Sequence, residues 1–164
     1  MKSTTVLAGG LAGAVTVTLL HESIRRVAPQ APRMDRLGMQ AISKGLKKAG
    51  LKVPKDEALF TLAMAGDLVS NAIYYSAAGI GSEKNIWVRG SLLGLAAGIG
   101  AVLLPKPLGL NESHSNKTVA TQVMTVGLYV TGALVSTAVI KLLNKKKQVK
   151  HDEWEQRLMT SAMG

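Results

Sequence analysis

Hydrophobic residues are concentrated in four long stretches, which are separated by charged, glycine-containing or proline-containing segments. The stretches cover residues 5–20, 58–80, 86–104 and 119–143. Each is close to the ~20 residues that an α-helix needs to cross ~30 Å of hydrocarbon. The pattern therefore predicts an all-α fold, that of a polytopic membrane protein built as a four-transmembrane-helix bundle. The expected spans are about 4–27, 57–80, 84–104 and 117–143.

Residues that end or begin helices agree with these boundaries. Pro29 and Pro32 end the first helix, because proline lacks a backbone donor and restricts the residue before it. The second helix begins after Pro54, where Asp56 and Glu57 complement the positive end of the helix dipole. The connector after this helix is very short, so we expect the second and third helices to be antiparallel neighbours.

The first connector, residues 33–52, combines apolar and cationic positions. Four small or apolar residues fall roughly on one helical face: Leu37, Ala41, Leu46 and Ala49. Three lysines fall mostly elsewhere: Lys44, Lys47 and Lys48. This pattern favours a short amphipathic interfacial helix between the first two spans, although glycines in the segment leave a plain basic loop as the alternative. We expect one bundle domain, residues 1–143, followed by a basic and polar tail, residues 144–164.

The N-terminal stretch also resembles a secretory signal, because Lys2 precedes an apolar run. The run ends at Leu20, His21 and Glu22, without the small residues that precede a cleavage site. We therefore expect this stretch to be retained as the first helix.

Lysine and arginine are almost evenly divided between the two sides of the predicted bundle, so the positive-inside rule selects no orientation. Three interpretations remain open. The chain inserts in both orientations and pairs antiparallel, or one segment is re-entrant, or both termini lie outside and the first connector is cytoplasmic. We adopt the third as the working expectation for a multi-pass protein of a membrane such as the prokaryotic inner membrane.

Composition narrows the classes of partner. Hydrophobic residues make up 47% of the chain, aromatic residues 4%, and the net charge is +10. Because the cations lie in connectors and at span ends, we expect them to contact anionic headgroups of membrane lipids. No aromatic interleaving or recognition motif supports nucleic acid as a partner. Cysteine is absent, which excludes disulfides and thiol chemistry, and no nucleotide-binding motif points to a cofactor, so none is predicted.

Glycines four residues apart form flat rows on two of the predicted helices. One row consists of Gly90, Gly94 and Gly98, and a shorter row consists of Gly9 and Gly13. In a membrane such rows let helix backbones approach closely, so that dispersion contacts hold the helices together. The rows indicate tight packing within one chain or, as the alternative, association of identical chains into a homo-oligomer.

The second predicted span carries a polar stripe. Its members occupy positions i, i+3, i+4 and i+7: Asp67, Ser70, Asn71 and Tyr74. Asp67 lies ~15 Å into the span at a rise of 1.5 Å per residue, where an isolated carboxylate costs roughly 2.5–3.5 kcal/mol. It should therefore face other helices and find partners, with Arg89 as one candidate, or take up a proton. The stripe is either a binding site or a hydrogen-bonded clamp between helices.

A second polar cluster lies where the first helix meets the connector. Three of its residues are suited to proton transfer: His21, Glu22 and Asp35. Three arginines are suited to holding a lipid phosphate: Arg25, Arg26 and Arg33. The spacing matches no metal motif such as HExxH, so no metal site is predicted. The alternative is a solvated, salt-bridged helix end.

Three functions are compatible with these features. The first is binding or transport of a small cation, a proton or a polar solute at the stripe around Asp67. The second is an interfacial enzyme that acts on lipid headgroups with His21, Glu22 and Asp35. The third is a non-catalytic membrane scaffold or accessory subunit. Access of water to Asp67 favours the first, a headgroup-sized pocket joining His21, Glu22 and Asp35 favours the second, and fully paired polar atoms around Asp67 favour the third.

Overall fold

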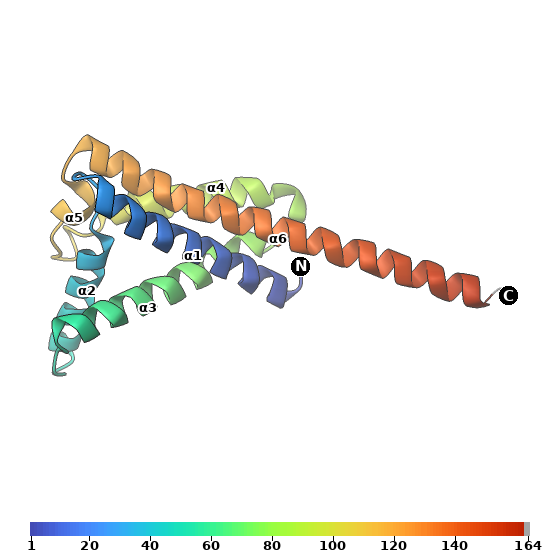
Figure 1. Ribbon diagram of the computed structural model, residues 1–164, viewed down its shortest axis with the longest axis horizontal. Helices are drawn as coiled ribbons and strands as arrows, with labels where there is room; N and C mark the ends of the chain where they lie inside the picture. The colour runs from blue at the N-terminus through green and yellow to red at the C-terminus, as the bar shows by residue number, and fades with distance from the viewer. Residues whose placement is uncertain (163–164) are drawn as a thin grey trace.

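The computed structural model describes the backbone of residues 1–162, the side chains of residues 1–146 and that of Met159. Within this part of the chain every regular element is helical (Figure 1). The α-helices are α1 (Ser3–Val27), α2 (Met34–Lys48), α3 (Asp56–Ser76), α4 (Ile86–Leu103), α5 (Ser113–Asn116) and α6 (Val119–Ala162). Two 3₁₀ turns lie between α3 and α4 in the described chain: η1 (Ala77–Gly79) and η2 (Glu83–Asn85). The predicted all-α fold is confirmed, and most of the first connector is helical, as α2.

Three helices in the described part of the chain are long and apolar enough to cross a membrane. They cover Ser3–Val27, Glu83–Leu103 and Val119–Lys146. The second predicted span, α3, is long enough with 21 residues, but its polar stripe lowers its mean hydropathy and it is not one of the three. The structure therefore supports three candidate spans where the hydrophobic pattern predicts four.

The helices are arranged around α6. Both α1 and α4 pack along α6, and α3 packs mainly against α1 (Figure 1). The N-terminal half of α3 diverges from α1, and α2 lies crosswise over the gap at that end of the bundle (Figure 1). Helices α1 and α3 thus remain in contact at one end and separate at the other.

The expectation that the second and third spans are close neighbours is wrong for most of their length, because α3 packs against α1 and α4 against α6. The two helices meet near their connector, where Tyr74 Oη donates a hydrogen bond of 3.0 Å to Leu93 O. Farther along they separate and leave a groove of about 380 Å³, whose walls include Tyr74, Ala97 and Tyr129. A short connector fixes where two helices begin to diverge, but not how far they stay together.

The glycine row on α4 explains why this helix packs against α6. Gly90, Gly94 and Gly98 are all buried at that contact. A Cβ atom on Gly94 would lie 2.7 Å from Val130 Cα, and one on Gly98 would lie 2.6 Å from Val126 Cα. No side chain fits in these spaces unless a backbone moves. The glycine row is therefore covered by α6 of the same chain.

The glycines of α1 pack in the same way. A Cβ atom on Gly13 would lie 2.5 Å from Gly132 O of α6. Tyr75 of α3 is fully buried beside this crossing, and its hydroxyl donates to Tyr129 O over 3.1 Å. Together with the buried Val17, these residues join α1, α3 and α6 into one core.

The end of the bundle that carries α2 is held together by polar contacts to backbone groups. Lys44 Nζ of α2 donates to Leu108 O over 2.6 Å, and Gln40 Oε1 accepts a 2.8 Å hydrogen bond from the backbone N–H of Asn111. On the other side, the backbone N–H of Arg33 donates to His114 O over 2.7 Å. These contacts fix α2 against α5 and against the segment that precedes α5.

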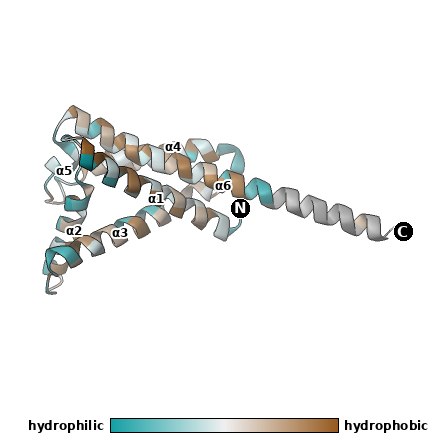
Figure 2. Cartoon of the chain, viewed as in Figure 1, coloured by the Kyte–Doolittle hydropathy of each residue, from teal (hydrophilic) through white to brown (hydrophobic). Residues whose placement is uncertain are grey.

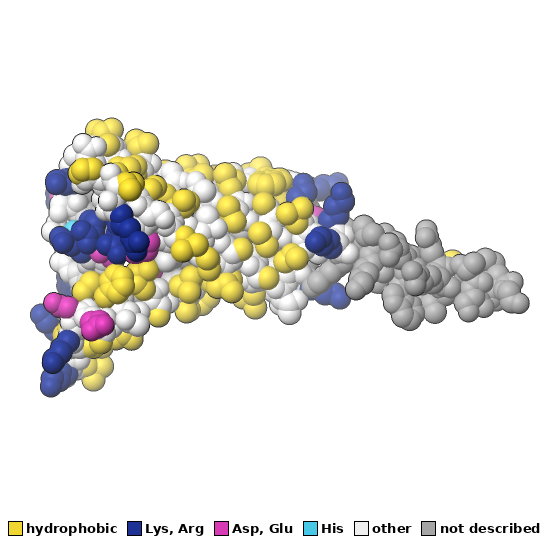
Figure 3. All heavy atoms as spheres, in the orientation of Figure 1, with side chains coloured by type: hydrophobic (Ala, Val, Ile, Leu, Met, Phe, Trp, Pro, Cys, Tyr) yellow, Lys and Arg dark blue, Asp and Glu magenta, His cyan; other side chains and the backbone are white. Residues whose placement is uncertain are grey.

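The surface separates apolar and charged residues along the long axis. Exposed leucines line the outward face of α1, among them Leu7, Leu11 and Leu19. Lysine and arginine gather at the α2–α5 end and where α6 leaves the bundle, with hydrophobic side chains between them (Figure 3). The hydropathy of the helices follows the same division (Figure 2). The bundle therefore presents an apolar waist between two cationic ends.

Candidate functional site

Asp67 lies on the face of α3 that is turned toward α1 and α2. Its side chain is partly buried, and no lysine or arginine among the described side chains lies within ion-pair distance of it. The Asn71 side chain, one turn farther along α3, is close enough to interact with the Asp67 carboxyl group. The carboxyl group is thus inside the bundle without a compensating cation.

A small cavity with both polar and apolar walls lies between α1, α2 and α3. Its walls are formed by Thr18, His21, Glu22, Met34, Asp35, Ala63, Met64 and Asp67. The volume of about 20 Å³ is enough for one water molecule, since a water needs roughly 10–15 Å³ by the same measure. The cavity joins Asp67 to the cluster of His21, Glu22 and Asp35, which the sequence presents as a separate site.

Two polar atoms of residues that line this cavity are buried without a hydrogen-bond partner in the described structure. They are Thr18 Oγ1 and His21 Nε2. His21 is 7% exposed, and its ring contacts the Tyr129 ring edge-on at a centroid distance of 5.6 Å. A buried polar group without a partner costs about 1–3 kcal/mol. Two such groups near one carboxyl group indicate a space arranged for a polar occupant.

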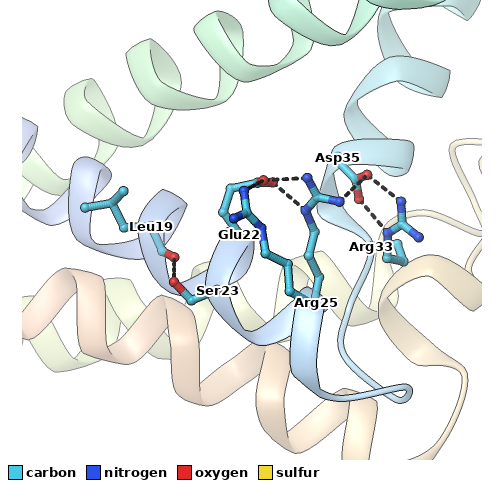
Figure 4. Close-up of polar contacts among 7 residues, drawn as sticks. Leu19, Glu22, Ser23, Arg25, Arg33 and Asp35 are labelled. Atoms are coloured by element: carbon cyan, nitrogen blue, oxygen red, sulfur yellow. Dashed lines mark hydrogen bonds and ion pairs between the residues drawn. The ribbon is translucent and has the colours of Figure 1, made fainter.

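A chain of charged side chains lies beside the cavity (Figure 4), and its carboxylates, Glu22 and Asp35, are part of the cavity wall. Arg25 Nε donates to Glu22 Oε1 over 2.7 Å, and Arg25 Nη1 lies 3.9 Å from Asp35 Oδ2. Arg33 donates two hydrogen bonds to Asp35, of 2.9 and 2.7 Å. Arg25 therefore lies between two carboxylates that belong to different helices, and the network ties α1 to α2.

The network controls the charge of Asp35. Burial favours the neutral acid, but the hydrogen bonds from Arg33 and from the Arg36 backbone, with the charges of Arg33 and Arg25, outweigh burial and hold the pKa of Asp35 below its ordinary value. Asp35 is consequently ionised near neutral pH. Glu22 and Asp35 each have an arginine partner, and Asp67 has none among the described side chains.

The remaining residues of the polar stripe do not join the cavity. Ser70 is exposed, and its hydroxyl donates to Asp67 O of its own helix. Tyr74 bonds to α4 as described above. Arg89 is far from Asp67 along the bundle, where its Nε donates to Ala78 O over 3.1 Å and its Nη2 is buried without a partner in the described structure. Arg26 points outward, with 73% of its side chain exposed, at 3.9 Å from Glu22.

Thr18 is the cavity residue that sequence reasoning missed, and a signal for it is present. Thr18, His21, Glu22 and Arg25 occupy positions i, i+3, i+4 and i+7 of α1. This is the same spacing that marks the polar stripe on α3, and it places the four side chains on one face. In the structure Thr18, His21 and Glu22 of the α1 stripe line one cavity with Asp67 of the α3 stripe.

No cluster of three or more His, Cys, Asp and Glu side chains in the described part of the chain is arranged to hold a metal ion. No protein-family model, curated protein or solved structure matches this chain.

Proposed function

We propose that this chain is a multi-pass membrane protein in which α3 is a fourth, tilted span. The outward face of α3 supports this proposal, because Leu62, Val69 and Ile73 are each between 47% and 65% exposed. Such a face is costly in water and favourable in lipid. Its opposite face buries Asp67 and Asn71, as expected for polar residues within a span. On this view α2 lies at the headgroup level, across the end of the bundle.

We further propose that the cavity between α1, α2 and α3 binds a proton or one small cation. The observation that carries this proposal is the Asp67 carboxyl group, which has no cationic partner among the described side chains, in a water-sized space with His21 Nε2, which has no hydrogen-bond partner there. A carboxylate in a site of low dielectric is stabilised when it takes up a positive charge. An imidazole ring in its neutral form has one nitrogen that donates and one that accepts a hydrogen bond, so His21 can hold a water molecule beside Asp67.

The size and polarity of the cavity favour this function over the two alternatives. A space of about 20 Å³ holds a proton-carrying water but not a lipid headgroup, so it gives no support to an enzyme that acts on headgroups. The unpaired polar atoms of Thr18 and His21 have no use in a scaffold, whose buried polar groups should all be paired. A larger polar solute would require the cavity to open.

We expect access to the cavity from the α2 end of the bundle. Toward the opposite end, α1 and α6 approach at Gly13 and Gly132, and Tyr75 fills the space beside them. Transport, as opposed to binding, therefore requires that α1 and α6 move apart at this crossing, because the crossing closes the bundle between the cavity and the opposite end.

The experiment compares Asp67→Asn with Asp56→Asn. Asp56 is an exposed carboxylate in the first turn of the same helix, so the control makes the same chemical change outside the cavity. Wild type and both variants are purified and examined by infrared difference spectroscopy between pH 4 and 9 for a titrating buried carboxyl band. The proteins are also reconstituted into vesicles, and proton flux is followed with an entrapped pH indicator under an imposed potential.

We expect Asp67→Asn to lose the buried carboxyl band, and any flux present in the wild type, while Asp56→Asn keeps both. Unfolding temperatures in detergent verify that each variant is folded. If the wild type and Asp67→Asn gave identical spectra and took up the same number of protons and monovalent cations, the site would not bind a cation and the proposal would be withdrawn.

A further inference from the structure

A second, larger cavity lies beside the network of charged side chains, at the α2–α5 end of the bundle. Its volume is about 480 Å³, within the range of about 300–1,000 Å³ that is common for ligand pockets. Its polar and charged lining residues are Arg25, Arg33, Arg36, Asn111, Ser113, His114 and Lys117. These residues come from the end of α1, the start of α2 and the segment around α5.

The permanent charges on the wall of this pocket are cationic. Arg25 and Arg33 are partly neutralised by Glu22 and Asp35, as described above. Arg36 and Lys117 are exposed and form no ion pair with any described side chain. Like charges that face one cavity repel each other, so an anion between them would relieve the repulsion.

The pocket is held open by contacts that do not involve its unpaired cations. The hydrogen bond from the Arg33 backbone to His114 O fixes one wall. Asn111 Oδ1 accepts hydrogen bonds from the backbone N–H and the hydroxyl of Ser113, which fix the turn before α5. Thr121 Oγ1 donates to Gln30 O over 2.8 Å and holds the corner after α1 against α6. An anion would therefore meet a pocket that is already formed.

His114 faces the same cavity. Burial lowers the pKa of His114, and the charges of Arg36 and Arg33 lower it further, while Asp35 acts in the opposite direction. The imidazole is consequently neutral near pH 7, and it can donate one N–H to an anion without adding to the positive charge of the empty pocket.

We propose that this pocket binds a phosphate group, either as a free anion or as part of an anionic lipid headgroup. Planar guanidinium groups match the paired oxygens of phosphate and bind them through two hydrogen bonds. Arg36 and Lys117 supply the unpaired charge, Arg33 a second guanidinium, and His114 a neutral donor. Arg26, which the sequence suggests for this role, does not line the pocket.

The lipid source is consistent with the position of the pocket at the cationic α2–α5 end of the apolar waist (Figure 3), and it rests on the membrane location proposed above. The pocket itself is distinct from the cavity at Asp67. Asp67→Asn changes no residue that lines the pocket, and this variant should still bind phosphate, so the failure of either proposal would not decide the other.

The test uses the double variant Arg36→Gln/Lys117→Gln, in which neither residue is part of a described ion pair. The matched control is Lys47→Gln/Lys48→Gln, which removes the same net charge from exposed positions at the far end of α2. Full-length proteins in nonionic detergent are titrated by calorimetry with inorganic phosphate, short-chain phosphatidylglycerol and short-chain diacylglycerol. Thermal unfolding without ligand checks that each of the two double variants is folded.

We expect the wild type and the control to bind at least one phosphate probe, with a Kd about tenfold or more higher in Arg36→Gln/Lys117→Gln, since hydrogen bonds to charged groups are the strong ones. Tighter binding of phosphatidylglycerol identifies the headgroup as the source, and binding of inorganic phosphate alone identifies the free anion. The proposal is overturned if the wild type binds neither phosphate probe, if diacylglycerol binds as tightly as phosphatidylglycerol, or if the control loses as much affinity as the pocket variant.

Discussion

The α4–α6 contact and the α1–α3 contact use small and polar residues in opposite ways. At α4–α6 a glycine row brings the backbones together, and the buried Thr137 hydroxyl donates to Ala133 O. At α1–α3 the helices touch closely at one end only, and at the other end the Thr18 hydroxyl and His21 Nε2 face a cavity without partners. Close packing with satisfied polar groups holds the bundle together, whereas an unsatisfied polar space costs stability and is suited to binding.

The largest effect should come from filling the α4–α6 contact. Gly94→Val places a branched side chain against Val130 Cα and Ala133 Cβ, which would lie 2.7 and 2.9 Å from the new Cβ atom. We expect a loss of about 3 kcal/mol or more in the free energy of unfolding, at the upper end of the range for overpacking. Thermal unfolding in detergent measures it.

Gly127→Val is the control for this substitution, because a Cβ atom on Gly127 meets nothing within 4 Å. It should change stability by no more than about 0.5 kcal/mol. Equal losses in the two variants would mean that the α4–α6 contact is not the tight interface described here.

A smaller effect is expected at the network that joins α1 to α2. Asp35→Asn removes the charge from two hydrogen bonds with Arg33 and should cost about 2 kcal/mol at pH 7. Because the pKa of Asp35 is lowered on folding, its carboxylate stabilises the fold above its unfolded pKa of about 3.9 and loses this effect as the pH falls through the folded pKa. Wild type and variant should therefore differ in unfolding temperature near pH 7 and converge below about pH 4. A constant difference down to pH 2 would contradict this role.

The smallest effects compare two threonines, one at each contact. Thr137→Val loses a satisfied buried hydrogen bond and should destabilise the protein by about 1 kcal/mol. Thr18→Val removes a buried hydroxyl that has no partner in the described structure, so stability should be unchanged or rise by up to about 1 kcal/mol. Thr18→Val should also weaken proton uptake at Asp67, measured by the carboxyl band. Two equal losses of stability would remove the proposed difference between the contacts.

Much of the fold could be predicted from the sequence, because its signals are local. The periodicity of apolar residues and the prolines at 29 and 32 give the start of each long helix and the end of α1 to within a few residues, whereas α6 continues to Ala162, well beyond the predicted end of the last span at residue 143. The row at Gly90, Gly94 and Gly98 predicts a close helix contact, and such a contact is present. The inward position of Asp67 follows from the cost of exposing a carboxylate to lipid.

The candidate site could be predicted only in separate parts. Asp67 and the His21–Glu22 pair are visible as polar stripes, but nothing local indicates that they share a cavity. Their meeting depends on α3 packing against α1 instead of α4, a choice made by the glycines of three helices together. The proposed phosphate pocket could be predicted only in part for the same reason. Lys117 and His114 are distant in sequence from Arg33, and the fold brings them together.

The arginine–carboxylate network has a further consequence because it forms a wall between the small cavity and the large pocket. Glu22 and Asp35 line the small cavity, while Arg25 and Arg33, which neutralise them, line the large pocket. An anion that draws the guanidinium groups toward itself weakens their hold on the two carboxylates, and a positive charge entering beside Asp67 competes for those same carboxylates. If both proposed sites bind their ions, occupancy on one side of this wall should alter affinity on the other, and thermodynamic reciprocity requires the influence to be equal in both directions.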